Sequence, residues 1–181
     1  FMNHIYNVYY FIDKFDSNEI LNLNKKIIII YRNYNNHNVE NDIKKIKKLC
    51  KFHNRKVFIS NNLKIALKYN LNGLYIPSFN KDLSFKNISL KNEFKIIGSA
   101  HNIKEIKTKE KQGCSSIFIS PLFKNNKNKP YLETIRFNLL CQNTNAKAIA
   151  LGGINATNIN RLFCTKAYGY AGISGIKKTG L

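Results

Sequence analysis

Residues 146–155 read Ala-Lys-Ala-Ile-Ala-Leu-Gly-Gly-Ile-Asn. The first six form a short and mostly apolar run, and two glycines end it just before a polar segment. A short, continuous apolar run that ends at glycine is typical of a strand buried on both faces, as in a parallel sheet covered by helices. This stretch therefore favours an α/β fold.

Seven further short apolar runs, rich in β-branched and aromatic residues, are spread along the chain. They cover residues 8–12, 27–31, 57–59, 73–76, 94–97, 116–119 and 169–173. The segments between them suit amphipathic helices, which we predict over residues 39–53, 61–69, 103–112 and 155–164. The first of these is the clearest, with lysines on one face and an apolar face made of Ile43, Ile46, Leu49 and Cys50. Eight strands alternating with helices predict a closed (β/α)8 TIM barrel.

A chain of 181 residues can build one buried core and is too short for two ordinary domains. We therefore predict a single domain over residues 1–181. A TIM barrel typically needs about 200 residues or more, and the shortage falls at the ends. The first helix, residues 17–24, is predicted to be short, and the last helix to be truncated or absent because only residues 177–181 remain for it.

The net charge of +20 indicates a basic protein, but its composition does not resemble that of a nucleic-acid interface. Lysine supplies 26 of the 30 basic residues, and asparagine and isoleucine are also abundant. All three have A/T-rich codons, which indicates codon drift on solvated positions. Nucleic-acid sites usually depend on arginine for bidentate contacts. We expect no specific nucleic-acid partner, although the charge favours anionic substrates.

Two further features limit the class of protein. No apolar run approaches the roughly 20 residues that span a bilayer, and the N-terminus has no signal-peptide pattern, so we expect a cytoplasmic protein without a membrane partner. The four cysteines are widely scattered, and no Cys/His cluster is present. This spacing predicts reduced thiols and no zinc site.

Glycine-rich segments follow the seventh and eighth predicted strands, where TIM barrels commonly bind phosphate. Gly152 and Gly153 permit the backbone to approach an anion, and the N-terminus of the predicted helix that follows would offer free N–H groups. Residues 172–175 read Gly-Ile-Ser-Gly and again combine backbone amides with a hydroxyl. The sequence therefore predicts a phosphorylated small molecule as the partner.

Several motifs, in order along the chain, resemble those of the thiamine-phosphate synthase/TenI superfamily. Residues 113–123, Gly-Cys-Ser-Ser-Ile-Phe-Ile-Ser-Pro-Leu-Phe, are similar to its "GADYIxxGPxF" segment. The glycine turn within residues 148–155, followed by residues 169–174, resembles the end of that family's barrel. Weaker similarities lie at residues 9–13, 31–33, 73–77, 96–101 and 129–130.

The resemblance implies a TIM barrel and one of two activities of thiamine biosynthesis. The synthase, a transferase, couples an aminopyrimidine pyrophosphate to a thiazole phosphate and uses Mg²⁺ to assist departure of pyrophosphate. The TenI-type enzyme tautomerises a thiazole carboxylate phosphate with a histidine. Both bind the thiazole phosphate after the last two strands, which implies a phosphate site at Gly152, Gly153, Ile173 and Ser174.

The resemblance also places the pyrophosphate site. Arg32 matches the family arginine there, but the family lysine two residues later is Tyr34. In the loop after the sixth predicted strand, Asn125 replaces a threonine, and Lys129 matches the family lysine after a one-residue insertion.

The Mg²⁺ carboxylates of the family fall on Asn61 and Asn80, unless a two-residue slip brings in Asp82. Mg²⁺ prefers charged oxygen ligands, so two amides would hold it poorly. We assign Asn61 to substrate binding and no residue to a metal.

His101 and Ser99 are the candidate acid–base residues. An imidazole can exchange protons near neutral pH, as a tautomerisation requires, and Ser99 lies two residues earlier on the same face of a strand. The synthase, a tautomerase that uses His101, and a non-catalytic barrel that only binds the ligand all remain open. Another phosphate-binding barrel enzyme is a further alternative, because many such barrels share this phosphate site.

Overall fold

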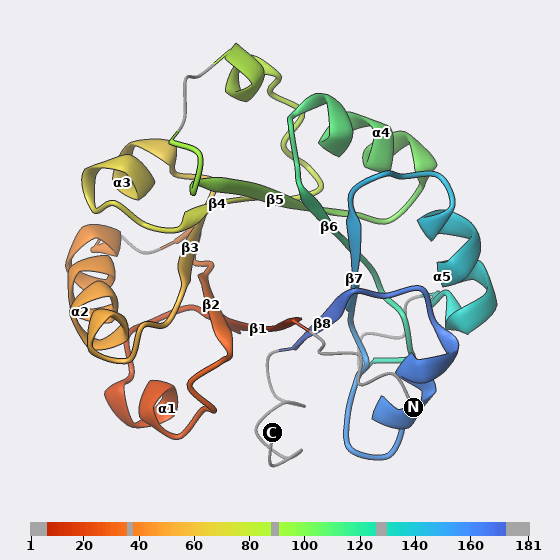
Figure 1. Ribbon diagram of the computed structural model, residues 1–181, viewed down its shortest axis with the longest axis horizontal. Helices are drawn as coiled ribbons and strands as arrows, with labels where there is room; N and C mark the ends of the chain where they lie inside the picture. Colours follow the sequence, from red (N-terminus) through yellow and green to blue (C-terminus); the bar gives the residue numbers. More distant parts are fainter. Residues whose placement is uncertain (1–6, 36–37, 88–90, 126–129, 173–181) are drawn as a thin grey trace.

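The computed structural model describes residues 7–35, 38–87, 91–125 and 130–172. Eight parallel strands close into a barrel in which each strand pairs with the next and β8 pairs with β1, as Figure 1 shows. Helices surround the barrel on the outside. The predicted (β/α)8 TIM barrel is confirmed.

The strands are short and nearly uniform in length. They are β1 (Asn7–Ile12), β2 (Ile28–Tyr31), β3 (Val57–Ser60), β4 (Gly73–Ile76), β5 (Lys95–Ala100), β6 (Ser116–Ile119), β7 (Lys147–Leu151) and β8 (Gly169–Gly172). The α-helices are α1 (Ser17–Leu21), α2 (Val39–Phe52), α3 (Leu63–Lys68), α4 (Ile103–Lys111) and α5 (Glu133–Cys141), and two short 3-10 helices are η1 (Ser84–Asn87) and η2 (Ile159–Cys164).

The eight strands lie where the sequence predicts them, within three residues at each end. The first helix is short, as expected, whereas the predicted truncation after β8 lies outside the described residues. Two expectations differ from the structure. The sequence did not identify α5, and the helix predicted from Asn155 begins only at Ile159, as a 3-10 helix.

Two apolar layers hold the fold together. Inside the barrel, aromatic rings from three strands meet edge to face, and Phe118 contacts Tyr9, Phe11 and Tyr75 with ring centroids 4.9–6.0 Å apart. Outside the barrel, the other faces of the strands pack against the helices. Aromatic rings fill the barrel interior, so ligand chemistry is confined to the barrel's two ends.

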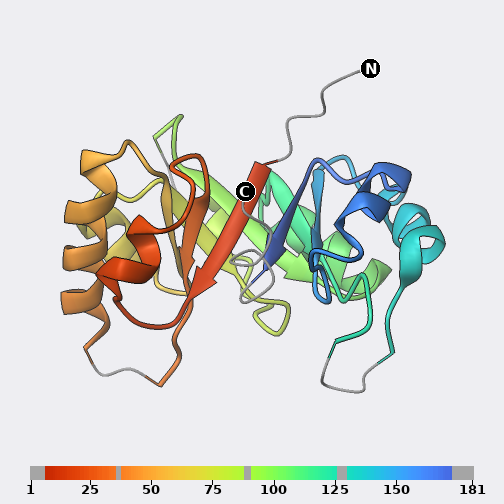
Figure 2. The same ribbon diagram turned by 90° about the horizontal axis from the view of Figure 1, so that it is seen from below.

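The strand arrows in Figure 2 point to the lower side of the molecule, so the loops that follow the strands gather there. No helix in the described part of the chain is long and apolar enough to cross a membrane. The four cysteines are free thiols, with Cys50 and Cys114 buried and Cys164 exposed.

Candidate active site at the carboxyl ends of the strands

Arg32 is held at the mouth of the barrel by the end of β2. Its backbone N–H donates to the Ile12 carbonyl at 2.8 Å, which continues the β1–β2 ladder by one residue. Because Arg32 lies two residues after the interior residue Ile30, its side chain turns inward. The guanidinium carbon lies 4.5 Å from the centroid of the Phe11 ring, a cation–π contact. A half-buried cation therefore sits over the aromatic interior.

Tyr75 on β4 lies beside this cation and was not singled out from the sequence. Burial raises the pKa of the Tyr75 hydroxyl to about 12, and hydrogen bonds with Ser99 and Arg32 act in the opposite direction. Tyr75 is therefore a neutral hydroxyl beside Ser99 and Arg32. The structure thus brings together two of the predicted site residues.

Tyr34 occupies the place where the family pattern has a lysine. Its hydroxyl lies 3.0 Å from the Ser60 hydroxyl, and its ring meets the Phe79 ring edge to face, with centroids 5.6 Å apart. Both rings are largely exposed, at 51% and 64%. This side of the mouth presents an aromatic pair in place of a positive charge.

Asn61 and Asn80 follow β3 and β4 and contact each other. The Asn80 side-chain amide donates to the Asn61 side-chain oxygen, and the Asp82 backbone N–H donates to Asn80 Oδ1 at 2.8 Å. Asn61 adopts a left-handed backbone (φ 58°), which asparagine tolerates better than most residues. The two positions predicted to lie together do so, as a neutral amide pair.

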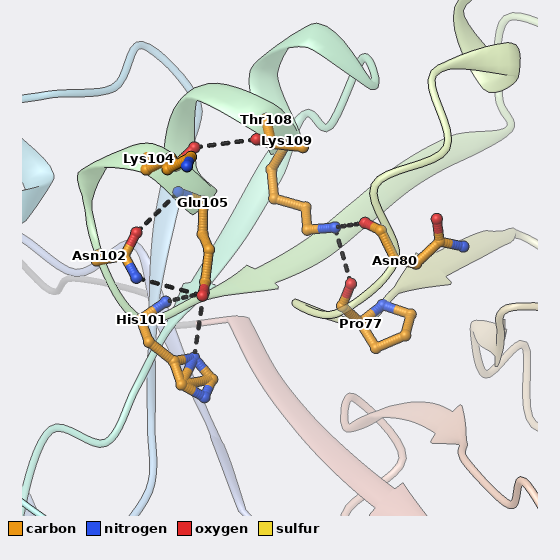
Figure 3. Close-up of polar contacts among 8 residues, drawn as sticks. All are labelled: Pro77, Asn80, His101, Asn102, Lys104, Glu105, Thr108 and Lys109. Carbon is orange, nitrogen blue, oxygen red and sulfur yellow. Dashed lines mark hydrogen bonds and ion pairs between the residues drawn. The ribbon is translucent and has the colours of Figure 1, made fainter.

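Ser99 and His101 separate at the end of β5. Ser99 is buried and faces Tyr75, whereas the His101 side chain is 51% exposed. Asn102 caps α4 through the Glu105 N–H, and the Glu105 carboxylate accepts the His101 backbone N–H at 2.8 Å (Figure 3). His101 Nδ1 lies 3.6 Å from the same carboxylate. His101 thus takes part in a helix cap at the rim of the mouth.

The turn after β7 packs tightly against the loop after β6. Gly152 and Gly153 have positive φ angles of 93° and 72°, and a Cβ on Gly153 would lie 2.3 Å from the Phe123 carbonyl oxygen. The Phe123 N–H donates to the Gly152 carbonyl at 3.1 Å. Within the described residues, the backbone N–H groups of Gly153 and Ile154 donate no hydrogen bond. In this turn, two N–H groups therefore have no acceptor among the residues that the structure describes.

The helix dipole expected to support this turn is missing. Asn158 Nδ2 donates to the Gly153 carbonyl at 2.8 Å, and Asn158 Oδ1 accepts the Asn155 N–H at 2.9 Å. These side-chain bonds hold residues 153–158 as a compact turn, so regular structure starts at Ile159. The expectation of a helix N-terminus at Asn155 is wrong. After β7, an anion site would therefore rely on the glycine turn and not on a helix dipole.

The sequence matches the family described as thiamine monophosphate synthase over residues 18–176, which is most of the chain. The chain belongs to this family. A curated relative, the thiamine-phosphate synthase of Prochlorococcus marinus subsp. pastoris (strain CCMP1986 / NIES-2087 / MED4), is 36% identical over 121 residues, which are 65% of this chain and 34% of the relative. The thiamine-phosphate synthase of Clostridium acetobutylicum is 29% identical over 136 residues, 73% of this chain and 64% of the relative. This member of the family therefore spans about a third of the length of the first of these relatives.

The fold agrees with this membership. The thiamine phosphate pyrophosphorylase of Pyrococcus furiosus superposes with a TM-score of 0.77 at 17% identity, covering 98% of this chain and 93% of that one. At this identity the likeness shows the shared barrel.

The Mg²⁺ site that thiamine monophosphate synthase motifs imply does not fit the residues at the mouth. Asn61 and Asn80 bond to each other and carry no charge. The alternative ligand, Asp82, accepts the Ser84 backbone N–H and hydroxyl, both at 2.9 Å. Within the described residues, no group of three or more His, Cys, Asp or Glu side chains could hold a metal ion.

Three predicted site residues, Lys129, Ile173 and Ser174, lie outside the described residues. Asn125 is described and is half-buried at the end of the loop after β6. The sequence reasoning also missed Lys109 on α4, whose ammonium reaches the backbone of the loop that carries Asn80. A signal was available, because Lys109 lies three residues after the buried Ile106 and so on the inner face of the helix.

Proposed function

We propose that this barrel binds a thiazole phosphate at the turn after β7 and couples it to an aminopyrimidine pyrophosphate, forming thiamine phosphate. The observation that carries the proposal is the family match over residues 18–176. The curated relatives are named for the synthase, which favours it over the tautomerase and over a barrel that only binds.

The phosphate of the thiazole belongs at Gly153 and Ile154 in this proposal. Two backbone N–H groups without partners among the described residues, on a turn with left-handed glycines, form the kind of concave donor site that accepts oxyanions. The proposal extends this site to Ile173 and Ser174, as the family resemblance implies.

Arg32 supplies the positive charge for the pyrophosphate. When the bond between the pyrimidine methylene and the pyrophosphate oxygen breaks, negative charge develops on the departing group. A guanidinium preoriented over Phe11 and beside Tyr75 can meet that charge without reorganising. Asn61 and Asn80 add neutral amides nearby, and we expect any requirement for Mg²⁺ to be weak.

The experiment is a direct assay of thiamine phosphate formation, with Arg32→Met as the test variant. Removing a preorganised donor costs about 10² to 10³ in rate, so kcat/KM should fall by that factor. Arg136→Met is the matched control, since Arg136 is exposed on α5, and it should change kcat/KM by less than about twofold. The proposal is wrong if the wild-type chain forms no product at any Mg²⁺ concentration, or if both variants behave alike.

A further inference from the structure

Lys109 is unusual because it is completely buried. Among the lysines whose side chains the structure describes, it is the one with a buried side chain, at 0% exposure. Taking an ammonium group out of water is costly unless hydrogen bonds replace the water. Composition bias explains lysines on the surface, where they cost little, but it does not explain this one. Lys109 must therefore be stabilised by its contacts.

Those contacts lead to one loop, either directly or through Gln112 at the end of α4. Lys109 Nζ donates at 2.8 Å to each of three oxygens, the Pro77 carbonyl, the Asn80 carbonyl and Gln112 Oε1; Figure 3 shows the first two. Gln112 is equally buried, and its Nε2 donates to the Asn80 and Asp82 carbonyls at 3.1 and 2.8 Å. Four hydrogen bonds thus run from the end of α4 to the backbone of residues 77–82.

The aliphatic stem of the Lys109 side chain packs against strand β5 of the barrel. A Cβ on Gly98 of β5 would lie 2.7 Å from Lys109 Cδ and 2.9 Å from Cys114 Sγ. Glycine at position 98 leaves the space that the stem fills. Among the described carboxylates, none forms an ion pair with Lys109, and burial lowers the pKa of its ammonium to about 8. The buried donors of Lys109 and Gln112 are compensated by five hydrogen bonds, four to backbone carbonyls and one to Gln112 Oε1.

We propose that Lys109, acting with Gln112, is a positioning residue that holds the loop at residues 77–82 and thereby sets Asn80 against Asn61 at the mouth of the barrel. Its importance for substrate binding rests on the proposed function, but its control of the loop does not. Without the ammonium, the Pro77 carbonyl keeps only the Asn80 N–H as a donor, and the loop loses two of its four bonds to α4. The stem alone would still fill the space beside Gly98.

The test uses Lys109→Met, which keeps an unbranched apolar stem and removes the donors. Lys111→Met, on the exposed side of the same helix, is the matched control. Ile106→Val serves as a purely structural comparison, because Ile106 is buried on α4 and does not bond to the loop. The readout is amide hydrogen exchange at Asn80, Asp82 and Ser84, whose N–H groups are bonded within the loop.

We expect Lys109→Met to speed exchange of these three amides at least about tenfold relative to the strands. Lys111→Met and Ile106→Val should leave that ratio unchanged. In calorimetry with inorganic pyrophosphate, Lys109→Met should also weaken binding several-fold. Uniform acceleration over the whole chain, or no change, in Lys109→Met would overturn the proposal. If wild-type protein does not bind pyrophosphate, the proposed function fails, and the exchange ratio still decides the role of Lys109.

Discussion

Replacing Gly153 by alanine should destabilise the fold much more than the same replacement at Gly113. Both glycines have positive φ angles, 72° and 80°, so both variants place an alanine in the same unfavourable backbone region. They differ in the space around the added Cβ. At Gly113 nothing lies within 4 Å, whereas at Gly153 the Cβ would lie 2.3 Å from the Phe123 oxygen and 2.6 Å from the Lys124 oxygen.

The expected magnitudes follow from these two terms. The left-handed conformation costs alanine roughly 1–2 kcal/mol, and the lower entropy of the unfolded chain returns about 0.4–1 kcal/mol. Gly113→Ala should therefore lose about 1 kcal/mol. At Gly153 the neighbouring atoms belong to the backbone and cannot rotate away, which adds roughly 1–3 kcal/mol of overpacking. Gly153→Ala should lose about 2–4 kcal/mol.

Urea unfolding followed by circular dichroism measures both values at neutral pH. A shift in the midpoint without a change in slope would report stability directly. Equal losses for Gly153→Ala and Gly113→Ala would refute the packing between the β7 turn and the loop after β6. A large loss at Gly153 would also mean that substitutions there move the whole turn, so they cannot by themselves test an anion site.

Three further predictions concern the mouth of the barrel and the buried lysine behind it. The pair Asn61→Asp plus Asn80→Asp should make the melting temperature rise with millimolar MgCl₂, whereas that of the wild type should stay constant. Between pH 8 and 10.5, the wild type should gain stability relative to Lys109→Met: the difference between their free energies of unfolding should rise by at most about 3 kcal/mol. If this difference does not change with pH, the lysine is not buried as described. The sign is set because, in this range, the unfolded lysine (pKa 10.5) holds a proton that the folded one, with a pKa of about 8, has lost. His101→Ala should cost coupling far less than the roughly 10²- to 10⁴-fold that a positioned acid or base contributes, as measured by kcat/KM.

The barrel could be predicted because each strand is a continuous apolar run, which can be recognised from its own residues without knowing what it packs against. The helices were harder to predict. In α5 the apolar Ile135 and Leu139 are exposed, at 75% and 55%, so the helical period is blurred. After β7, the pattern of Ile159 and Leu162 indicated a helix, but the side chain of Asn158 bonds the backbone into a turn first. Periodicity does not detect such side-chain bonds.

In the candidate site, too, some residues could be predicted from the sequence and others could not. Arg32, Ser99 and Asn61 occupy strand ends, and the order of strands places them together at one end of a barrel. Lys109 lies at no strand end, and its spacing from Ile106 places it on the inner face of α4 without showing what it binds. What distinguishes it is the space beside Gly98 and the carbonyls 29 and 32 residues away in sequence, which only the folded chain brings close.

The amide pair indicates that the poor fit to Mg²⁺ comes from two side chains and not from the fold. In wild type, Asn80 Nδ2 donates to Asn61 Oδ1, and Asn80 Oδ1 accepts the Asp82 backbone N–H, so both side-chain oxygens already accept a hydrogen bond without a cation. A single change, Asn80→Asp, keeps the acceptor for the Asp82 backbone N–H, and the new carboxylate can accept from the Asn61 side chain once that amide rotates.

Only the double change sets two carboxylates at hydrogen-bond distance with no proton between them. Two like charges about 4 Å apart at an effective dielectric constant near 20 repel by up to about 4 kcal/mol. A divalent cation or a shared proton relieves that repulsion. The neutral wild-type amides do not repel each other, so a cation gains nothing there. The loop held by Lys109 already places both positions together, so the double variant should gain its affinity for Mg²⁺ without any change in the backbone.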